Sequence, residues 1–172
     1  TSFRQGVNLY LPWFPVKNLK EAKDFYQERY ASIYQKGTKY AYAICLKENN
    51  LPIDYVNIDL DDSHDLGYGL KKMNIGIKEL LVKPLKRYST SKKDNLCYLT
   101  ATHDIKNIHS GNVMKKVGMH YCYSYKEQWM PKKRPVIFRM YQINLDGKNG
   151  FIKNIGINMN ILLKKTYKGQ VI

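Results

Sequence analysis

The stretch Tyr98–Met119, which reads YLTATHDIKNIHSGNVMKKVGM, constrains the fold of this chain more than any other. Its first five residues are apolar or rich in threonine, which predicts a short strand over Tyr98–Thr102. We expect a polar turn over His103–His109 and then a short helix that begins at Ser110, because serine suits an N-cap. Gly118 stands where a left-handed helix stop would fall. The stretch therefore predicts a strand, a turn and a helix in succession.

The predicted helix has one apolar side and a basic end. Val113, Met114 and Val117 recur with the spacing of one helix face, which indicates that this face packs against the rest of the molecule. Lys115 and Lys116 lie in the last turn, where cations complement the helix dipole.

Length and composition indicate one globular domain. The chain has 172 residues with 44% hydrophobic residues, enough for a core. No apolar run approaches the roughly 20 residues of a membrane span, and no signal-peptide pattern is present at the start. The three cysteines are widely spaced and odd in number, which favours reduced thiols in the cytoplasm. Neither they nor His64, His109 and His120 have metal-ligand spacing, so we expect no metal site.

The net charge is +15, from 29 basic and 14 acidic residues. Such a charge favours anionic partners, such as nucleic acid or the phosphates of coenzyme A (CoA). The alternative is a lysine-rich solvated surface from an AT-rich genome. We prefer that alternative, because the basic residues are scattered and the 15 tyrosines form no RNA-binding signature. Nucleic acid is therefore not an expected partner.

Periodicity predicts further elements on both sides of the Tyr98–Met119 stretch. Helical spacing extends over Leu19–Tyr34, with Asn18 as its cap. Alternation and turn residues predict four strands, with a hairpin turn at Asn49-Asn50 between the first two. These strands are Tyr40–Leu46, Pro52–Ile58, Tyr121–Glu127 and Pro135–Asn144.

The pattern Asn107-x-x-Ser110-x-x-Val113-Met114-Lys115-Lys116-x-Gly118-Met119 resembles the acyl-CoA-binding segment of the GNAT N-acetyltransferase superfamily. It is most similar to the branch that includes the ribosomal-protein N-terminal acetyltransferases. Leu11-Pro12-Trp13 and Glu127-Gln128-Trp129-x-Pro131 resemble two more segments of that branch. The resemblance covers Leu11–Leu70 and Lys92–Gly147. The alternative is an ordinary strand, turn and helix with a good cap.

The resemblance implies an α/β fold, with a mixed twisted sheet flanked by helices in one domain over residues 1–147. Leu66–Leu70 would be the central strand, whose backbone binds the pantetheine arm. This strand and Tyr98–Thr102 would run parallel and diverge, which forms a notch for the thioester. Gly67 and Gly69 would permit a bulge and the close approach of the ligand. Relatives begin with a strand and a helix before Leu-Pro-Trp, and we expect this chain to lack them.

The resemblance also implies transfer of an acetyl group from acetyl-CoA to a primary amine. Ser110 would donate a proton to the departing thiolate or cap the helix, and Glu127 or His103 would be the general base. Met114 stands where many relatives have a tyrosine as general acid. The partners would be acetyl-CoA and an amine whose identity the sequence does not give, and a homodimer is compatible with this. The residues expected to bind the cofactor are Gly67, Tyr68, Gly69, Leu70, Gly76, Asn107, Ser110, Lys115 and Lys116.

The chain departs from the family where the pyrophosphate-binding loop should stand. Residues 71–79 contain a single glycine, Gly76, where the family has several. Pro84 then interrupts the expected helix. Met73–Ser91 can be encoded so that an adjacent frame reads EYWNKGIVSEASKAVFNK, which resembles the missing segment. The tail, residues 148–172, likewise has a family-like alternate frame. We therefore hypothesise a frameshift at both places. The rival interpretations are a degraded relative that does not bind CoA and a basic RNA-associated module that uses its tyrosines for stacking.

Overall fold

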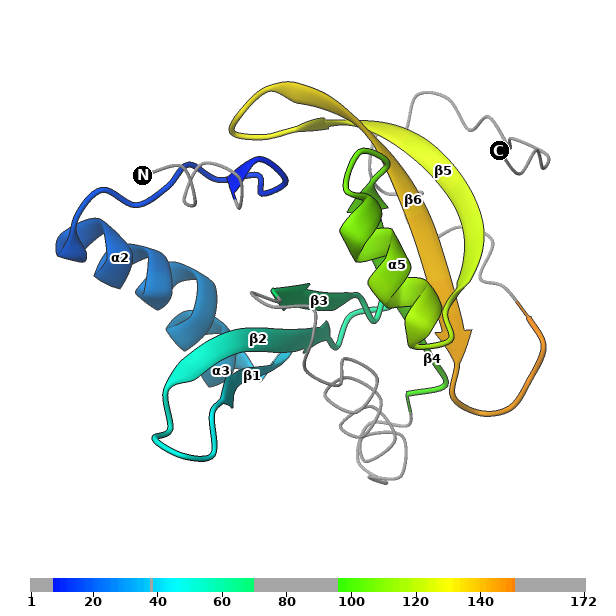
Figure 1. The fold of residues 1–172 in the computed structure, drawn as a ribbon, viewed down its shortest axis with the longest axis horizontal. Helices are drawn as coiled ribbons and strands as arrows, with labels where there is room; N and C mark the ends of the chain where they lie inside the picture. Colours follow the sequence, from blue (N-terminus) through cyan, green and yellow to red (C-terminus); the bar gives the residue numbers. More distant parts are fainter. Residues whose placement is uncertain (1–7, 38, 70–95, 151–172) are drawn as a thin grey trace.

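Two three-stranded antiparallel sheets form the centre of the computed structural model, which describes residues 8–37, 39–69 and 96–150 (Figure 1). The first sheet has the order β1-β2-β3 and the second has the order β4-β6-β5. No helix in the described part of the chain is long and apolar enough to cross a membrane. The strands are β1 (Lys39–Cys45), β2 (Pro52–Asp59), β3 (Leu66–Gly69), β4 (Tyr98–Asp104), β5 (His120–Trp129) and β6 (Arg134–Asn144).

The strands agree with those predicted from alternation and turns. β1 and β2 form the expected antiparallel hairpin, with Asn50 at a positive φ in its turn. β4 is longer than expected and includes His103 and Asp104, which the sequence placed in the following turn. Pairing with β6 explains the extension, because Asp104 still lies opposite Phe138 in the ladder. The α/β class and the single domain are confirmed.

The predicted helix Leu19–Tyr34 is present, but it is not uniform. It consists of α2 (Leu19–Tyr26), a π-helical turn η1 (Gln27–Ala31) and α3 (Ser32–Lys36). Asn18 caps it as expected, because its side chain accepts a hydrogen bond from the Glu21 amide. None of these residues is buried, so the predicted apolar stripe contributes a partly exposed wall and not a core.

Helix α5 (Ile108–Lys116) follows β4 after a short turn, as the sequence predicts, but it begins earlier than expected and its cap differs from the expected one. The N-cap is Asn107, whose Oδ1 accepts from the Ser110 amide at 3.3 Å, and Ser110 lies inside the first turn. Asparagine and serine cap equally well, so the sequence did not discriminate between them. Gly118 ends the helix at φ 92°, with the Met119 amide bonded to the Met114 carbonyl.

The hydrophobic core lies between α5 and the two sheets. The predicted stripe is buried completely: Val113, Met114 and Val117 are at most 5% exposed. They pack in one cluster with Leu99 of β4 and Leu66 of β3. This packing holds α5 against the two sheets near the point where they meet.

Gly67 and Gly69 leave space for side chains of the neighbouring strand. Gly67 lies opposite Asn57 and Gly69 opposite Tyr55, and the β2–β3 register runs without the bulge we expected. A Cβ at Gly69 would lie 2.2 Å from Tyr55 Cε1, and one at Gly67 would lie 2.3 Å from Asn57 Oδ1. The side chains of β2 therefore lean across β3, which explains two glycines in a strand of four residues.

Several expectations lie outside the described residues. These are the roles of Leu70 and Gly76, the loop and interrupted helix over residues 71–91, and the tail from residue 151 onwards. The frameshift hypothesis therefore stays a prediction.

We expect Gly69→Ala to destabilise the protein by about 1–3 kcal/mol, because the added methyl overlaps the Tyr55 ring. Chemical denaturation would measure this change. In a Tyr55→Ala background the same substitution should cost little, since the ring is then absent. Gly150→Ala is the control, because a Cβ at Gly150 meets no atom within 4 Å. Equal costs of Gly69→Ala in both backgrounds would contradict the proposed packing.

We expect Asn107→Ala to lower the free energy of unfolding by about 1 kcal/mol through loss of the α5 cap. Asn112→Ala is the matched control, because Asn112 is exposed within the same helix and caps nothing. Thermal unfolding of both variants checks the prediction. If the two substitutions have the same effect, the cap does not contribute to stability.

Candidate active site

The two sheets meet at one point and then separate. Asp65 and Thr100 form a parallel bridge, and the Thr100 amide also donates to the His64 carbonyl at 3.1 Å. Beyond this bridge β3 pairs only with β2, and β4 pairs only with β6, among the described strands. β3 and β4 thus start side by side in parallel and continue in different sheets, which leaves backbone groups of both strands without a partner strand among the described residues along the notch between them.

A hydrogen bond joins β3 to α5 on the side of the notch that faces the helix. The Tyr68 side chain of β3 reaches α5, where its hydroxyl donates to the Ser110 carbonyl at 2.9 Å. Burial raises the pKa of Tyr68 above its usual range, so the hydroxyl stays protonated and keeps this bond. The bond fixes the start of α5 relative to β3, directly beside the notch.

Asn107 and Ser110 form a small polar group at the start of α5. Asn107 Nδ2 donates to Ser110 Oγ at 3.1 Å, in addition to the cap bond described above. The Ser110 hydroxyl accepts from Asn107, so its own proton remains available to a ligand. Lys115 and Lys116 lie at the opposite, C-terminal end of the helix and are exposed.

The opposite side of the notch carries a carboxyl group that the sequence analysis missed. Asp65 alternates with Leu66, which is buried in the α5 cluster, so its side chain lies on the face away from α5. Burial, and then the nearby Asp59, raise the pKa of Asp65 to about 7, while Lys39 opposes this effect. Nothing in a single sequence marks an aspartate before a strand as a site residue. Its importance comes from the bridge to Thr100.

Glu127, an expected site residue, lies on β5 opposite Val136. Desolvation by burial raises its pKa, and it forms no hydrogen bond or ion pair with another described residue. Its neighbour Tyr125 lies on the same face of β5 and has a hydrogen bond with Thr102 of β4. Asp65 and Glu127 therefore both stand on the side of the sheets away from α5, although no contact joins them directly.

His103 lies on the α5 side and is buried. Its Nδ1 is 2.8 Å from the Asp104 carbonyl, which makes it the donor in the neutral ring, and its Nε2 has no partner among described residues. A Cβ at Gly111 would lie only 2.7 Å from this Nε2, so the ring packs against the α5 backbone. Burial lowers the pKa of His103. The geometry suits a neutral packing residue and not a base that reaches a substrate.

A cavity of about 340 Å³ opens on the side of the first sheet away from α5. Its floor includes Tyr55 and Asn57, the side chains that lean across β3, and its wall includes Arg29 and Tyr30 of η1. Trp13 closes one end and packs edge-on against Phe25, with ring centres 5.5 Å apart. Tyr55 and Asn57 lie on the same face as Gly69 and Gly67, so the cavity and the Asp65 face of β3 are on the same side of the first sheet.

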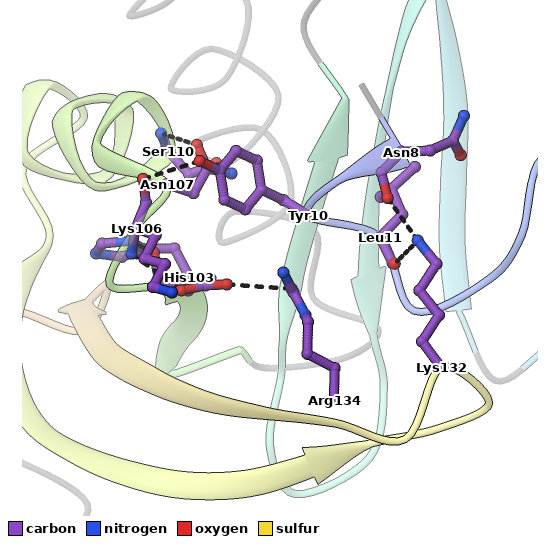
Figure 2. Close-up of polar contacts among 10 residues, drawn as sticks. Asn8, Tyr10, Leu11, His103, Lys106, Asn107, Ser110, Lys132 and Arg134 are labelled. Carbon is purple, nitrogen blue, oxygen red and sulfur yellow. Dashed lines mark hydrogen bonds and ion pairs between the residues drawn. The ribbon is translucent and has the colours of Figure 1, made fainter. Parts of the chain in front are cut away.

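The N-terminal segment ties the two halves of this region together (Figure 2). The Tyr10 hydroxyl donates to the Lys106 carbonyl at 3.1 Å, directly before the α5 cap. On its other side Lys132 Nζ, from the β5–β6 turn, donates to the carbonyls of Asn8 and Leu11 at 2.6 and 2.9 Å. Arg134, in β6, forms an ion pair with the buried Asp104 at 3.1 Å. These bonds hold residues 8–11 across the open end of the site.

The geometry divides the site into two sides that share the notch. The α5 side offers Ser110, Asn107 and unpaired backbone, whereas the opposite side offers two carboxyl groups with raised pKa values and a cavity. Among the described residues no group of three or more His, Cys, Asp or Glu side chains is placed to hold a metal ion.

Comparison with known proteins assigns this architecture to one family. The model of the acetyltransferase (GNAT) domain family matches residues 3–120. No curated protein sequence matches the chain.

Solved structures share the fold at low sequence identity. An acetyltransferase from Salmonella typhimurium that modifies the N-terminal serine of ribosomal protein L7/L12 superposes with a TM-score of 0.68 and 15% identity, over 83% of each chain. Spermidine N-acetyltransferase from Vibrio cholerae, in complex with CoA and spermine, superposes with a TM-score of 0.63 and 12% identity, over 82% of this chain and 83% of that one. A GNAT-family acetyltransferase from Bacillus anthracis superposes with a TM-score of 0.63 and 20% identity, over 82% of each chain. Because the family model covers more than half of the sequence and these structures share its fold, the chain belongs to the GNAT acetyltransferase family.

Proposed function

We propose that this chain transfers an acetyl group from acetyl-CoA to a primary amine. The observation that supports this most directly is the notch between β3 and β4, with α5 on one side and a cavity on the other. A ternary complex needs such an arrangement, because the amine must reach the carbonyl carbon of the bound thioester from the side that the cofactor does not occupy. Much of the rate in direct transfer comes from this positioning.

The cofactor would lie on the α5 side, with its pantetheine arm along the unpaired backbone of Gly67, Tyr68 and Gly69. A backbone amide of β3 would stabilise the tetrahedral oxyanion. Ser110 has a hydroxyl proton free to donate to the departing thiolate, a role that Met114 cannot take. Asn107 would orient Ser110, and its capping bonds support this role better than direct contact with the pantetheine.

The attacking amine must be neutral, so the site needs a base. Asp65 and Glu127 are the candidates, since both carboxyl groups lie on the side of the cavity and have raised pKa values. A pKa of about 7 suits a base that works near neutral pH, which favours Asp65. Glu127, the residue expected from the sequence, is the alternative.

Several finer assignments stay with this proposal. Lys115 and Lys116 would attract the CoA phosphates from the end of α5. A reducing cytoplasm would suit the three free cysteines, Cys45, Cys97 and Cys122. A homodimer is compatible with the arrangement of the site.

We expect kcat/KM to rise with pH around 7, as Asp65 loses its proton, and expect Asp65→Asn to remove this rise with a loss of about 10²–10⁴-fold in rate. Assays would use excess acetyl-CoA and follow thiol release across pH 5–9. Glu127→Gln is the matched comparison. If it removes the pH dependence while Asp65→Asn leaves it intact, the base is Glu127.

A stability measurement separates a structural effect from a catalytic one. Since the folded pKa of Asp65 is raised, the folded state binds more protons than the unfolded state between pH 4 and 7. Folding stability should therefore fall as the pH rises through this window, and Asp65→Asn should abolish that component. A stability profile unchanged by the substitution would show that Asp65 ionises normally.

We also expect the printed chain to bind acetyl-CoA weakly, because residues 71–91 lack the glycines that build a pyrophosphate cradle. A chain with the alternate-frame segments at residues 73–91 and from residue 148 should bind at about micromolar concentration. Isothermal titration calorimetry of both chains tests this. Equal micromolar binding would overturn the frameshift hypothesis and make the printed loop an unfamiliar CoA site.

A further inference from the structure

We propose that the amine acceptor also carries a carboxylate group, and that this group binds the Arg29 guanidinium in the cavity beside η1. The inference rests on the proposed function, because it assigns the acceptor to this cavity. Amino acids and acidic peptides satisfy the proposal, whereas polyamines do not.

Arg29 is exposed, but its guanidinium stacks on two aromatic rings and has no ionic partner among the described residues. Its guanidinium carbon lies 4.9 Å from the centre of the Trp13 ring and 5.4 Å from that of Phe25. Stacking on two rings orders the planar fork before any ligand arrives. No carboxylate in the described part of the chain forms an ion pair with Arg29, although it lines the cavity.

The backbone around Arg29 is also unusual. Arg29 and Tyr30 lie in the π-helical turn η1, which interrupts an otherwise regular helix. Such turns are rare and occur often at functional sites. Here the turn contributes both Arg29 and Tyr30 to the cavity wall.

The other charges of the cavity do not suit a polycation. Lys39 is already paired, because its Nζ lies 2.5 Å from Asp59 Oδ1. Among the described residues that line the cavity, Glu28 is the single acidic side chain, and Arg29 stands next to it in the sequence. The charges of Glu28 and Arg29 cancel, so the cavity offers a polyamine no net negative charge. The net charge of +15 on the chain attracts an anion and repels a polycation.

The remaining lining suits the body of such an acceptor. Trp13, Tyr30 and Tyr55 offer aromatic surface between Arg29 and the β3 edge. Asn57 leans across Gly67 at that edge, on the same face of β3 as Asp65. A carboxylate on Arg29 would hold the acceptor in the cavity, with its body directed toward Asn57 and the face of β3 that carries Asp65. Its 340 Å³ lies within the range of small-molecule sites, about 300–1,000 Å³.

Binding without acetyl-CoA tests the inference independently of catalysis. Calorimetry would use glutamate and a short acidic peptide with a free N-terminus, each beside its counterpart with every carboxylate amidated. We expect an acidic ligand to bind, and Arg29→Gln to weaken it by about 10- to 100-fold. Arg29→Lys should restore only part of the affinity, since lysine lacks the fork. Lys20→Gln, an exposed charge on α2, should have no effect. The ligand that binds distinguishes a free amino acid from a peptide.

Acetyl transfer then links the site to the reaction. With excess acetyl-CoA, we expect the acidic amine to be acetylated in preference to its amidated counterpart and to spermidine, and Lys20→Gln to leave this preference intact. Faster acetylation of spermidine, or binding unaffected by Arg29→Gln, would overturn the inference. Arg29-dependent binding without any acetyl transfer would support the carboxylate site and contradict the proposed transferase activity.

Discussion

The parallel bridge between Asp65 and Thr100 is the constraint on which the rest of the structure depends. Two antiparallel sheets share this bridge and no other ladder among the described strands, so β3 and β4 begin together and then separate. The turn before β3 reinforces the junction, because the Thr100 hydroxyl donates to the Ser63 carbonyl at 2.7 Å. Unpaired backbone groups beside a hydrophobic core are costly unless a ligand or water satisfies them. The notch is therefore the weak point of the sheet, which supports our proposal that it is the binding site.

The alternation of β3 gives the two sides of the notch different chemistry. Leu66 and Tyr68 point toward α5, where one joins the core and the other bonds the start of the helix. Asp65, Gly67 and Gly69 point the other way, and the glycines let Asn57 and Tyr55 lean across the strand into the cavity. One short strand thus separates a side suited to the cofactor from a side suited to the amine.

The sequence predicted the elements well because their signals are local. Alternation, the Asn49-Asn50 turn, and the stripe of Val113, Met114 and Val117 all arise within one element, and the structure confirms them. The resemblance to GNAT proteins, which the family match confirms, added the meeting of β3 and β4, a contact that local patterns do not specify.

The site was harder to predict because it depends on contacts between distant segments. Ser110 and Asn107 are neighbours as expected, yet the choice of Asn107 as cap follows from α5 geometry. Asp65 gains its raised pKa from burial in the folded chain and then from the nearby Asp59, and the two β3 glycines are explained only by the β2 register. In the sequence Arg29 is one residue of the predicted helix Leu19–Tyr34, and nothing there marks it as a site residue. Its place in the cavity wall follows from the π-helical segment η1 and from stacking on the Trp13 ring.

Amide chemical shifts of the labelled protein would test the central claim, that the notch binds acetyl-CoA, because NMR detects even weak binding. Titration with acetyl-CoA should shift the amides of Gly67–Gly69 on β3 and those of Ala101, Asn107 and Ser110, which border the α5 side. The amides of β1 should not respond. Shifts confined to exposed lysines, with β3 and the start of α5 unchanged, would contradict the assignment of the notch as the acetyl-transfer site.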